Sequence, residues 1–183
     1  MAAKSVPAGT AETRFSKRLN FSWLGDVLLQ AKGLFIPGLL SFLLAHLAYI
    51  TFFVKTGTGK GQLQKEPVTG LPVIIYVILF LWLLYPFLNT LRVPVTIYAA
   101  VIGCMLLMAL NQRGRVSSKA AMLLFNGALQ FVLSDSLSAV NLFAFPHKIL
   151  SLSVMVTYAG AQYLLVKGAL TSCNALPANT ANE

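Results

Sequence analysis

The sequence contains few of the residues from which most catalytic and metal sites are built. Of its 183 residues, five are Asp or Glu, two are His and two are Cys. Cys104 lies in an apolar stretch and Cys173 near the C-terminus, which excludes a disulfide framework and a cysteine-rich metal site. Two histidines also exclude a three-histidine metal site. The position of each acidic residue is therefore informative.

Charge of either sign is also scarce. Charged residues make up 10% of the chain and hydrophobic residues 57%, whereas about a quarter of an ordinary soluble domain is charged. Five windows are long enough, at about 1.5 Å per residue, to cross a hydrocarbon layer of about 30 Å. They are residues 33–54, 71–91, 93–110, 120–143 and 149–166. We expect an all-α, polytopic membrane helix bundle.

A sixth window, residues 19–31, is shorter and would span only about 20 Å. With it, the sequence predicts about six transmembrane helices, the first one short. The transmembrane domain then covers residues 19–171, between a polar basic N-terminal tail, 1–18, and a polar C-terminal tail, 172–183. The N-terminal tail has no apolar core, so we expect no secretory signal peptide.

The basic residues indicate how these helices are oriented. The chain has 14 Lys and Arg residues. With six crossings, one face of the membrane receives Lys32, Arg92 and Lys148, and the opposite face receives the other 11. This asymmetry predicts that both termini are cytoplasmic. The basic segments then contact anionic lipid, and nucleic acid is not expected as a partner.

Two features interrupt the helical pattern. Residues 55–70 are rich in Gly and Lys and are expected to form a flexible cytoplasmic loop. Pro86 lies inside a hydrophobic window, where the missing N–H is expected to kink the helix.

Both aspartates, Asp26 and Asp135, fall inside hydrophobic windows. A carboxylate is costly in a membrane and usually faces the protein interior or a wet cavity. In the predicted topology, each lies about 8 to 9 Å from the same membrane face. The two carboxyl groups are therefore candidates for one shared catalytic cavity. The alternative is that each only hydrogen-bonds neighbouring helices.

Other polar residues follow helical spacing. Five form a stripe beside Asp135: Asn126, Gln130, Ser134, Ser138 and Asn141. Two further pairs each share a helix face: His46 with Tyr49, and Tyr158 with Gln162. We expect Ser134 and these two pairs to line or orient a substrate site, and the alternative is helix packing.

Three other functions use the same residues. Asp26, Asp135 and His46 are a candidate zinc-ligand set. Ser134, His46 and an aspartate are the residue types of a nucleophilic triad, although no nucleophile-elbow sequence surrounds Ser134. Intramembrane carboxylates also relay protons in transporters, although we find no inverted repeat of broken helices.

Four segments resemble a known family. They are "FSWLGDVLL", "LFIPGLLSFLLAHLAYITFF", "GALQFVLSDSLSAVNLF" and "TYAGAQYLL". In this order they are similar to the Gly-Asp, His-x-x-Tyr, Ser-Asp and Tyr-x-x-x-Gln segments of the lysoplasmalogenase family, both the bacterial YhhN type and the animal transmembrane type. The likeness covers residues 21–169, and "FVLSDSL" is closest to the animal branch.

The resemblance implies a multi-pass membrane enzyme that acts on a lysophospholipid. Lysoplasmalogenases cleave the vinyl ether bond of lysoplasmalogens and release a fatty aldehyde with glycerophosphoethanolamine or glycerophosphocholine. The family's motif aspartates correspond to Asp26 and Asp135. An animal-type protein would reside in the endoplasmic reticulum membrane, and a bacterial one in the inner membrane.

Vinyl ether chemistry suits two carboxyl groups. Protonation of the alkene carbon gives an oxocarbenium ion, water adds, and the hemiacetal collapses. Two buried carboxyl groups close together favour a state in which one is protonated and the other ionised. Such a pair supplies an acid and a base or counter-charge, as in glycosidases, without a metal or organic cofactor. Asp135 is our preferred acid.

One departure from the family pattern favours a different function. Family members usually have further hydrophobic helices, including a Lys-Pro motif, before the Gly-Asp segment. A polar leader stands there in this chain. The alternative hypothesis is an N-terminally reduced, non-catalytic protein that binds lipid or regulates another membrane protein.

Overall fold

A computed structural model describes residues 35–174 of the chain. The chain divides into two compact units, residues 1–49 and 50–183, and each is considered by itself. Asp26 and the short helix predicted over residues 19–31 lie outside the described residues. The helix α2, Phe35–Lys55, begins in the first unit and ends in the second.

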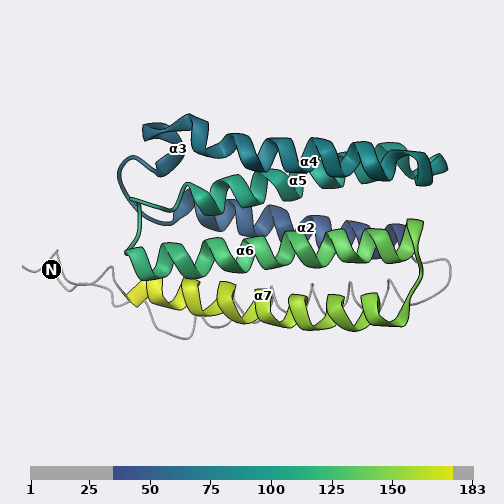
Figure 1. Cartoon of the computed structure of the whole chain (residues 1–183). Coiled ribbons are helices and arrows are strands. Elements are labelled where there is room, and N and C mark those ends of the chain that lie inside the picture. Colours follow the sequence, from purple (N-terminus) through teal and green to yellow (C-terminus); the bar gives the residue numbers. More distant parts are fainter. Residues whose placement is uncertain (1–34, 175–183) are drawn as a thin grey trace, which may run out of the picture. The chain divides into compact units, whose positions relative to one another are not determined.

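Five helices in the described part are long and apolar enough to cross a membrane. They are α2, α4 (Leu71–Leu84), α5 (Arg92–Leu110), α6 (Ser118–Ala139) and α7 (Lys148–Asn174), labelled in Figure 1. Each coincides with one of the five full-length windows. The helical membrane bundle expected from the sequence is therefore confirmed for this part of the chain. Helices satisfy their backbone hydrogen bonds internally, as hydrocarbon surroundings require.

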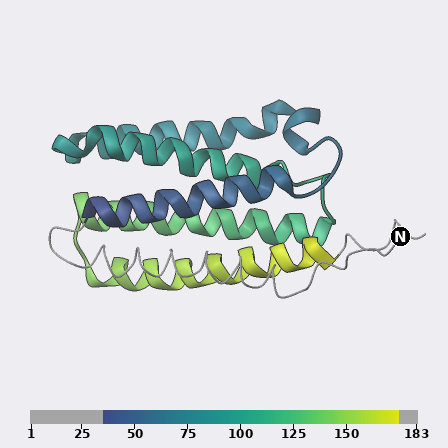
Figure 2. The same ribbon diagram turned by 180° about the vertical axis from the view of Figure 1, so that it is seen from behind.

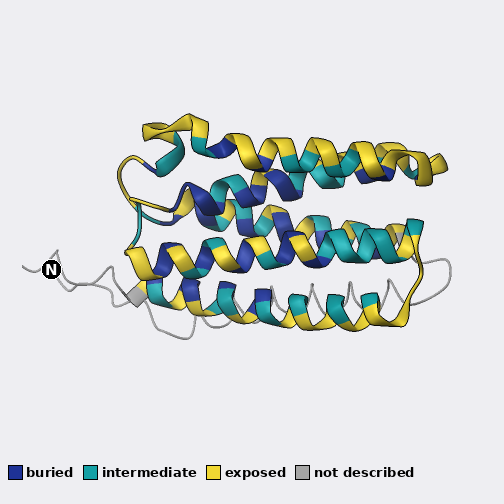
Figure 3. Ribbon diagram, in the orientation of Figure 1, coloured by how far each residue is buried: buried dark blue, intermediate teal, exposed yellow. Residues whose placement is uncertain are grey.

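Within residues 50–183, the four helices α4 to α7 run antiparallel to their neighbours in chain order, and both views show α6 beside α7 (Figures 1 and 2). The packing of α6 on α7 is the most extensive of these contacts. Among the described spans α4 is the least buried, and most of its ribbon has the colour of exposed residues (Figure 3).

Glycine brings α6 and α7 close together. A Cβ atom on Gly127 would lie 2.9 Å from the backbone nitrogen of Leu165 and 3.1 Å from the carbonyl oxygen of Ala161. Small residues allow this approach, and close packing replaces the hydrophobic driving force that is absent between helices in lipid.

The end of α4 differs from the sequence prediction. We expected Pro86 to kink a helix, but α4 ends at Leu84 and two 3₁₀ turns follow, η2 (Tyr85–Phe87) and η3 (Asn89–Leu91). Proline has no backbone N–H to donate to the preceding turn, and its ring clashes with that turn, so it ends the α-helix here.

The helix α6 continues at its C-terminal end into one π-helical turn, η4 (Val140–Ala144).

The segment 55–70 is also more ordered than predicted. Instead of a structureless loop it contains a helical turn, α3 (Gln62–Lys65), and a 3₁₀ turn, η1 (Pro67–Gly70). The backbone N–H of Leu63 donates to the side-chain oxygen of Asn111 at 3.0 Å. This bond ties the connection to the end of α5.

Two side chains after α5 satisfy the carbonyl groups at the end of α2. Gln112 Nε2 donates to the carbonyl oxygen of Phe53 at 2.7 Å, and Arg115 Nη2 donates to that of Val54 at 3.1 Å. Terminal carbonyls have no partner within their own helix, and a cation favours the negative end of the helix dipole. These contacts fix the turn that precedes α3.

The close approach at Gly127 predicts a specific sensitivity. We expect Gly127→Ala to lower the unfolding free energy by about 1–3 kcal/mol, because the added methyl group forces α6 and α7 apart. Asn126→Ala, at an exposed position on the same helix, should change it by less than about 0.5 kcal/mol. Unfolding in detergent, followed by circular dichroism, measures both. Equal stability of the two variants would contradict the packing argument.

Candidate functional site

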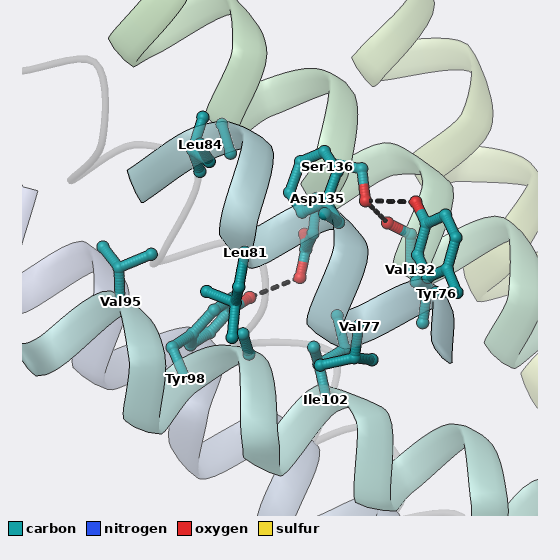
Figure 4. A pocket seen from close by; sticks show the side chains of 13 residues that line it. Tyr76, Val77, Leu81, Leu84, Val95, Tyr98, Ile102, Val132, Asp135 and Ser136 are labelled. Atoms are coloured by element: carbon teal, nitrogen blue, oxygen red, sulfur yellow. Dashed lines mark hydrogen bonds between the residues drawn. The ribbon is translucent and has the colours of Figure 1, made fainter. Parts of the chain in front are cut away.

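Asp135 is half-buried in the second half of α6. The phenolic O–H of Tyr98, on α5, donates a hydrogen bond to Asp135 Oδ2. Figure 4 shows this contact, which joins two helices through residues 37 positions apart in the chain. The carboxyl group predicted from sequence to face the protein interior therefore faces α5.

A second pair of hydroxyl groups lies beside the first. Tyr76 Oη, on α4, is 2.8 Å from Ser136 Oγ, and Ser136 Oγ donates to the carbonyl oxygen of Val132 at 2.8 Å (Figure 4). Ser136 has one hydroxyl hydrogen, which is directed at the carbonyl group, so Tyr76 is the donor to Ser136. The two tyrosines thus attach α4 and α5 to neighbouring positions of α6.

These four side chains border a small cavity between α4, α5 and α6. Its volume is about 50 Å³, more than the roughly 10–15 Å³ that a cavity needs to hold one water molecule. The rest of the lining is apolar and includes Val77, Leu81 and Ile102 (Figure 4). The described residues that line it include no Lys, Arg or His. A carboxyl group, three hydroxyl groups and room for water therefore meet inside a membrane-spanning bundle.

Ser134, next to Asp135, faces another neighbour. Its side chain is buried, and Oγ donates to the carbonyl oxygen of Val154 on α7 at 3.1 Å. Successive residues of an α-helix point about 100° apart, because 3.6 residues complete a turn. Ser134 therefore contacts α7, whereas Asp135 contacts α5.

Other members of the predicted polar stripe also face α7. A Cβ atom on Gly160 would lie 2.5 Å from Gln130 Oε1, and Asn141 Nδ2 donates to Ser151 Oγ at 3.1 Å. Asn126 is exposed. Gln130, Ser134 and Asn141 therefore contact α7.

The pair predicted on α7 does not border the cavity. The ring of Tyr158 packs edge-to-face on Phe131, with centroids 5.5 Å apart, and Gln162 is buried. Neither lines the cavity at Asp135. Of the predicted site residues in α6 and α7, the structure places Asp135 at this cavity.

His46 and Tyr49 belong to the first unit, and both are buried on α2. The ring nitrogen Nδ1 of His46 donates to the carbonyl oxygen of Phe42 at 2.6 Å. Among residues 35–174, no three His, Cys, Asp or Glu side chains form a group able to hold a metal ion. The candidate zinc set requires Asp26, which is outside the described residues.

Comparison with known proteins identifies the family. The YhhN family matches residues 3–169. The chain belongs to the YhhN family. The resemblance inferred from the four sequence segments is therefore confirmed. No solved structure matches the chain.

Relatives of this YhhN-family chain include vertebrate proteins named as enzymes. It is 32% identical to lysoplasmalogenase TMEM86A of Bos taurus over 166 residues, which cover 87% of this chain and 66% of the relative. It is 33% identical to human lysoplasmalogenase TMEM86B over 166 residues, 91% of this chain and 67% of the relative. The chain thus spans about two thirds of the length of these relatives.

The two tyrosine hydroxyl groups that contact α6 in this YhhN-family chain were not predicted from the sequence. Tyr76, in "LPVIIYVILF", and Tyr98, in "PVTIYAAVIG", are polar-tipped side chains within apolar spans. A buried tyrosine hydroxyl usually finds a hydrogen-bond partner, which was the available signal. Local spacing gave no indication of that partner, because each contact joins residues far apart in the chain.

The two tyrosines provide a matched test of the site's geometry. We expect Tyr98→Phe to lower the unfolding free energy by about 1–3 kcal/mol, because Asp135 Oδ2 loses its phenolic donor. Tyr76→Phe should cost less, since Ser136 keeps the Val132 carbonyl as its acceptor. Thermal unfolding of both variants in one detergent measures the difference. A larger loss for Tyr76→Phe would contradict the assigned contacts.

Proposed function

We propose that the chain is a membrane-embedded lysoplasmalogenase in which Asp135 is the acid. The observation that carries the proposal is the carboxyl group of Asp135, held by Tyr98 at a water-sized cavity between membrane-spanning helices. The names of the vertebrate relatives support the substrate class, a lysophospholipid with a vinyl ether bond.

In the first step, the protonated carboxyl group of Asp135 gives its proton to the alkene carbon that does not bear oxygen. The C=C electron pair forms the new C–H bond, and the neighbouring carbon becomes an oxocarbenium ion. The proton transfer leaves a carboxylate on Asp135. The hydrogen bond from Tyr98 stabilises this anion, because bonds from a donor to a charged acceptor are among the stronger ones.

In the second step, water adds to the oxocarbenium carbon. The cavity beside Asp135 has room for that water, and a carboxylate accepts the proton that the water gives up. In the collapse of the hemiacetal, its hydroxyl group gives a proton to the carboxyl pair, the pair gives a proton to the glycerol oxygen as the C–O bond breaks, and a fatty aldehyde leaves. The pair then holds the one proton with which the cycle began. Asp26 is part of the proposal as the second carboxylate, which acts as base or counter-charge to the cation.

The other predicted residues receive different roles in the proposal. Ser134, Tyr158 and Gln162 orient Asp135 indirectly. Ser134 and Tyr158 contribute to the packing of α6 on α7, and Gln162 is buried on α7. His46 and Tyr49 remain candidates for lining the substrate. No metal or organic cofactor enters either step.

The acid role predicts a large loss of turnover. Asp135→Asn should lower kcat by about 100-fold or more, because an amide cannot donate the required proton, and general acid catalysis contributes about 10² to 10⁴. Aldehyde release from an alkenyl lysophospholipid, with the purified chain in lipid nanodiscs, measures this. Asn126→Ala is the matched control on α6 and should retain wild-type activity.

Two outcomes would contradict the proposal. Turnover by Asp135→Asn within tenfold of wild type would exclude Asp135 as the acid. A wild-type chain that binds the alkenyl lysophospholipid but releases no aldehyde would favour the non-catalytic, lipid-binding alternative.

A further inference from the structure

A second hollow lies between α4 and α5, with a volume of about 180 Å³. Eight residues line it: Val73, Ile74, Val77, Ile78, Ala100, Gly103, Cys104 and Leu107. None carries a charge or an amide or hydroxyl group, so the lining has no strong hydrogen-bonding group to hold water. We call this hollow the α4–α5 groove.

The groove adjoins the cavity at Asp135. Val77 lines both spaces, and the α5 residues Ala99 and Ile102 of the cavity alternate with Ala100 and Gly103 of the groove. A Cβ atom on Gly103 would lie 2.9 Å from Val77 Cγ2. Val77, packed against Gly103, therefore borders both spaces.

The features along α5 follow a definite order. Arg92 begins the helix, Tyr98 follows six residues later, and Cys104 follows six residues after that. Each interval is about 9 Å along the axis at 1.5 Å per residue. The exposed guanidinium of Arg92 lies 4.5 Å from the centroid of the Tyr85 ring. Along α5, a cation is therefore followed by a carboxyl group with its tyrosine and then by an apolar groove.

A lysoplasmalogen has the matching order of groups: a phosphate, a vinyl ether and a hydrocarbon chain. We propose that the α4–α5 groove binds the part of the alkenyl chain next to the vinyl ether. This inference rests on the proposed function, since it takes Asp135 as the point where the vinyl ether lies. The groove is on the least buried span, which an alkenyl chain reaches laterally from the membrane.

The groove's contribution is positioning. Surrounding lipid is as apolar as the groove, so moving the chain from lipid into it brings little hydrophobic gain. Holding the first methylene groups fixes the alkene carbon relative to the carboxyl group, and such orientation raises kcat more than it lowers KM. The groove should therefore favour long alkenyl chains at the chemical step.

Photocrosslinking tests occupancy without catalysis. The probe is a lysophospholipid with a saturated ether bond, which this chemistry does not cleave, and a diazirine on the chain a few carbons from the ether. In nanodiscs, we expect mass spectrometry to find most crosslinks in residues 73–78 and 100–107. Cys104→Trp should reduce these crosslinks at least fivefold by filling the groove. Val156→Trp, at an exposed position on α7, is the matched control and should leave them unchanged.

Ala100→Leu fills the groove more gently and provides a second variant if Cys104→Trp fails to fold. For either variant, kcat should fall at least tenfold with a long-chain alkenyl lysophospholipid and less than twofold with one whose alkenyl chain ends after a few carbons. Equal losses for both substrates, or crosslinks on α7 as frequent as those at the groove, would overturn the inference.

The two proposals fail in distinguishable ways. Crosslinks at the groove in a chain that releases no aldehyde would uphold the binding site and overturn the catalytic function. Aldehyde release without crosslinks at the groove would overturn the binding site alone.

Discussion

The hydrogen bond from Tyr98 to Asp135 is the contact on which the rest of the candidate site depends. A carboxyl group within a membrane span is costly unless protein groups and water surround it. Here a phenol from α5 supplies a donor, and a small cavity supplies room for water. The chemistry proposed for the chain follows from these surroundings: a proton donor kept away from bulk water and beside an apolar space.

Neighbouring residues of α6 point in different directions around the helix axis, so one face of α6 packs on α7 and another carries the candidate site. Ser134 and Gly127 face α7, where the hydrogen bond from the Ser134 hydroxyl to a backbone carbonyl group and the close helix contact at Gly127 hold the two helices together. Asp135 and Ser136 face α5 and α4, each opposite a tyrosine. A rotation of α6 by about 100°, the angle of one residue, would exchange these partners. The tight seam with α7 therefore also sets the direction in which Asp135 points.

The sequence predicted those features that lipid imposes on every span. The five apolar helices were recoverable because a membrane requires long apolar segments, and Asp135 was recoverable because a carboxyl group stands out within one. Features set by contacts between distant residues were not. Tyr98 lies 37 residues from its partner Asp135. The ordered structure of residues 55–70 depends on a hydrogen bond to Asn111, which follows the next two long helices. Pro86 ends α4 instead of kinking it, because the effect of a proline depends on whether the chain must turn there.

The central claim is that a fixed carboxyl group delivers a proton to the alkene carbon of a vinyl ether. The most direct measurement is hydrolysis of an alkenyl lysophospholipid in D₂O, with the aldehyde reduced at once to its alcohol. The account predicts one deuterium on the carbon next to the former aldehyde, in a single configuration, because a fixed acid reaches one face of the alkene. Equal amounts of both configurations, or no deuterium at that carbon, would contradict it.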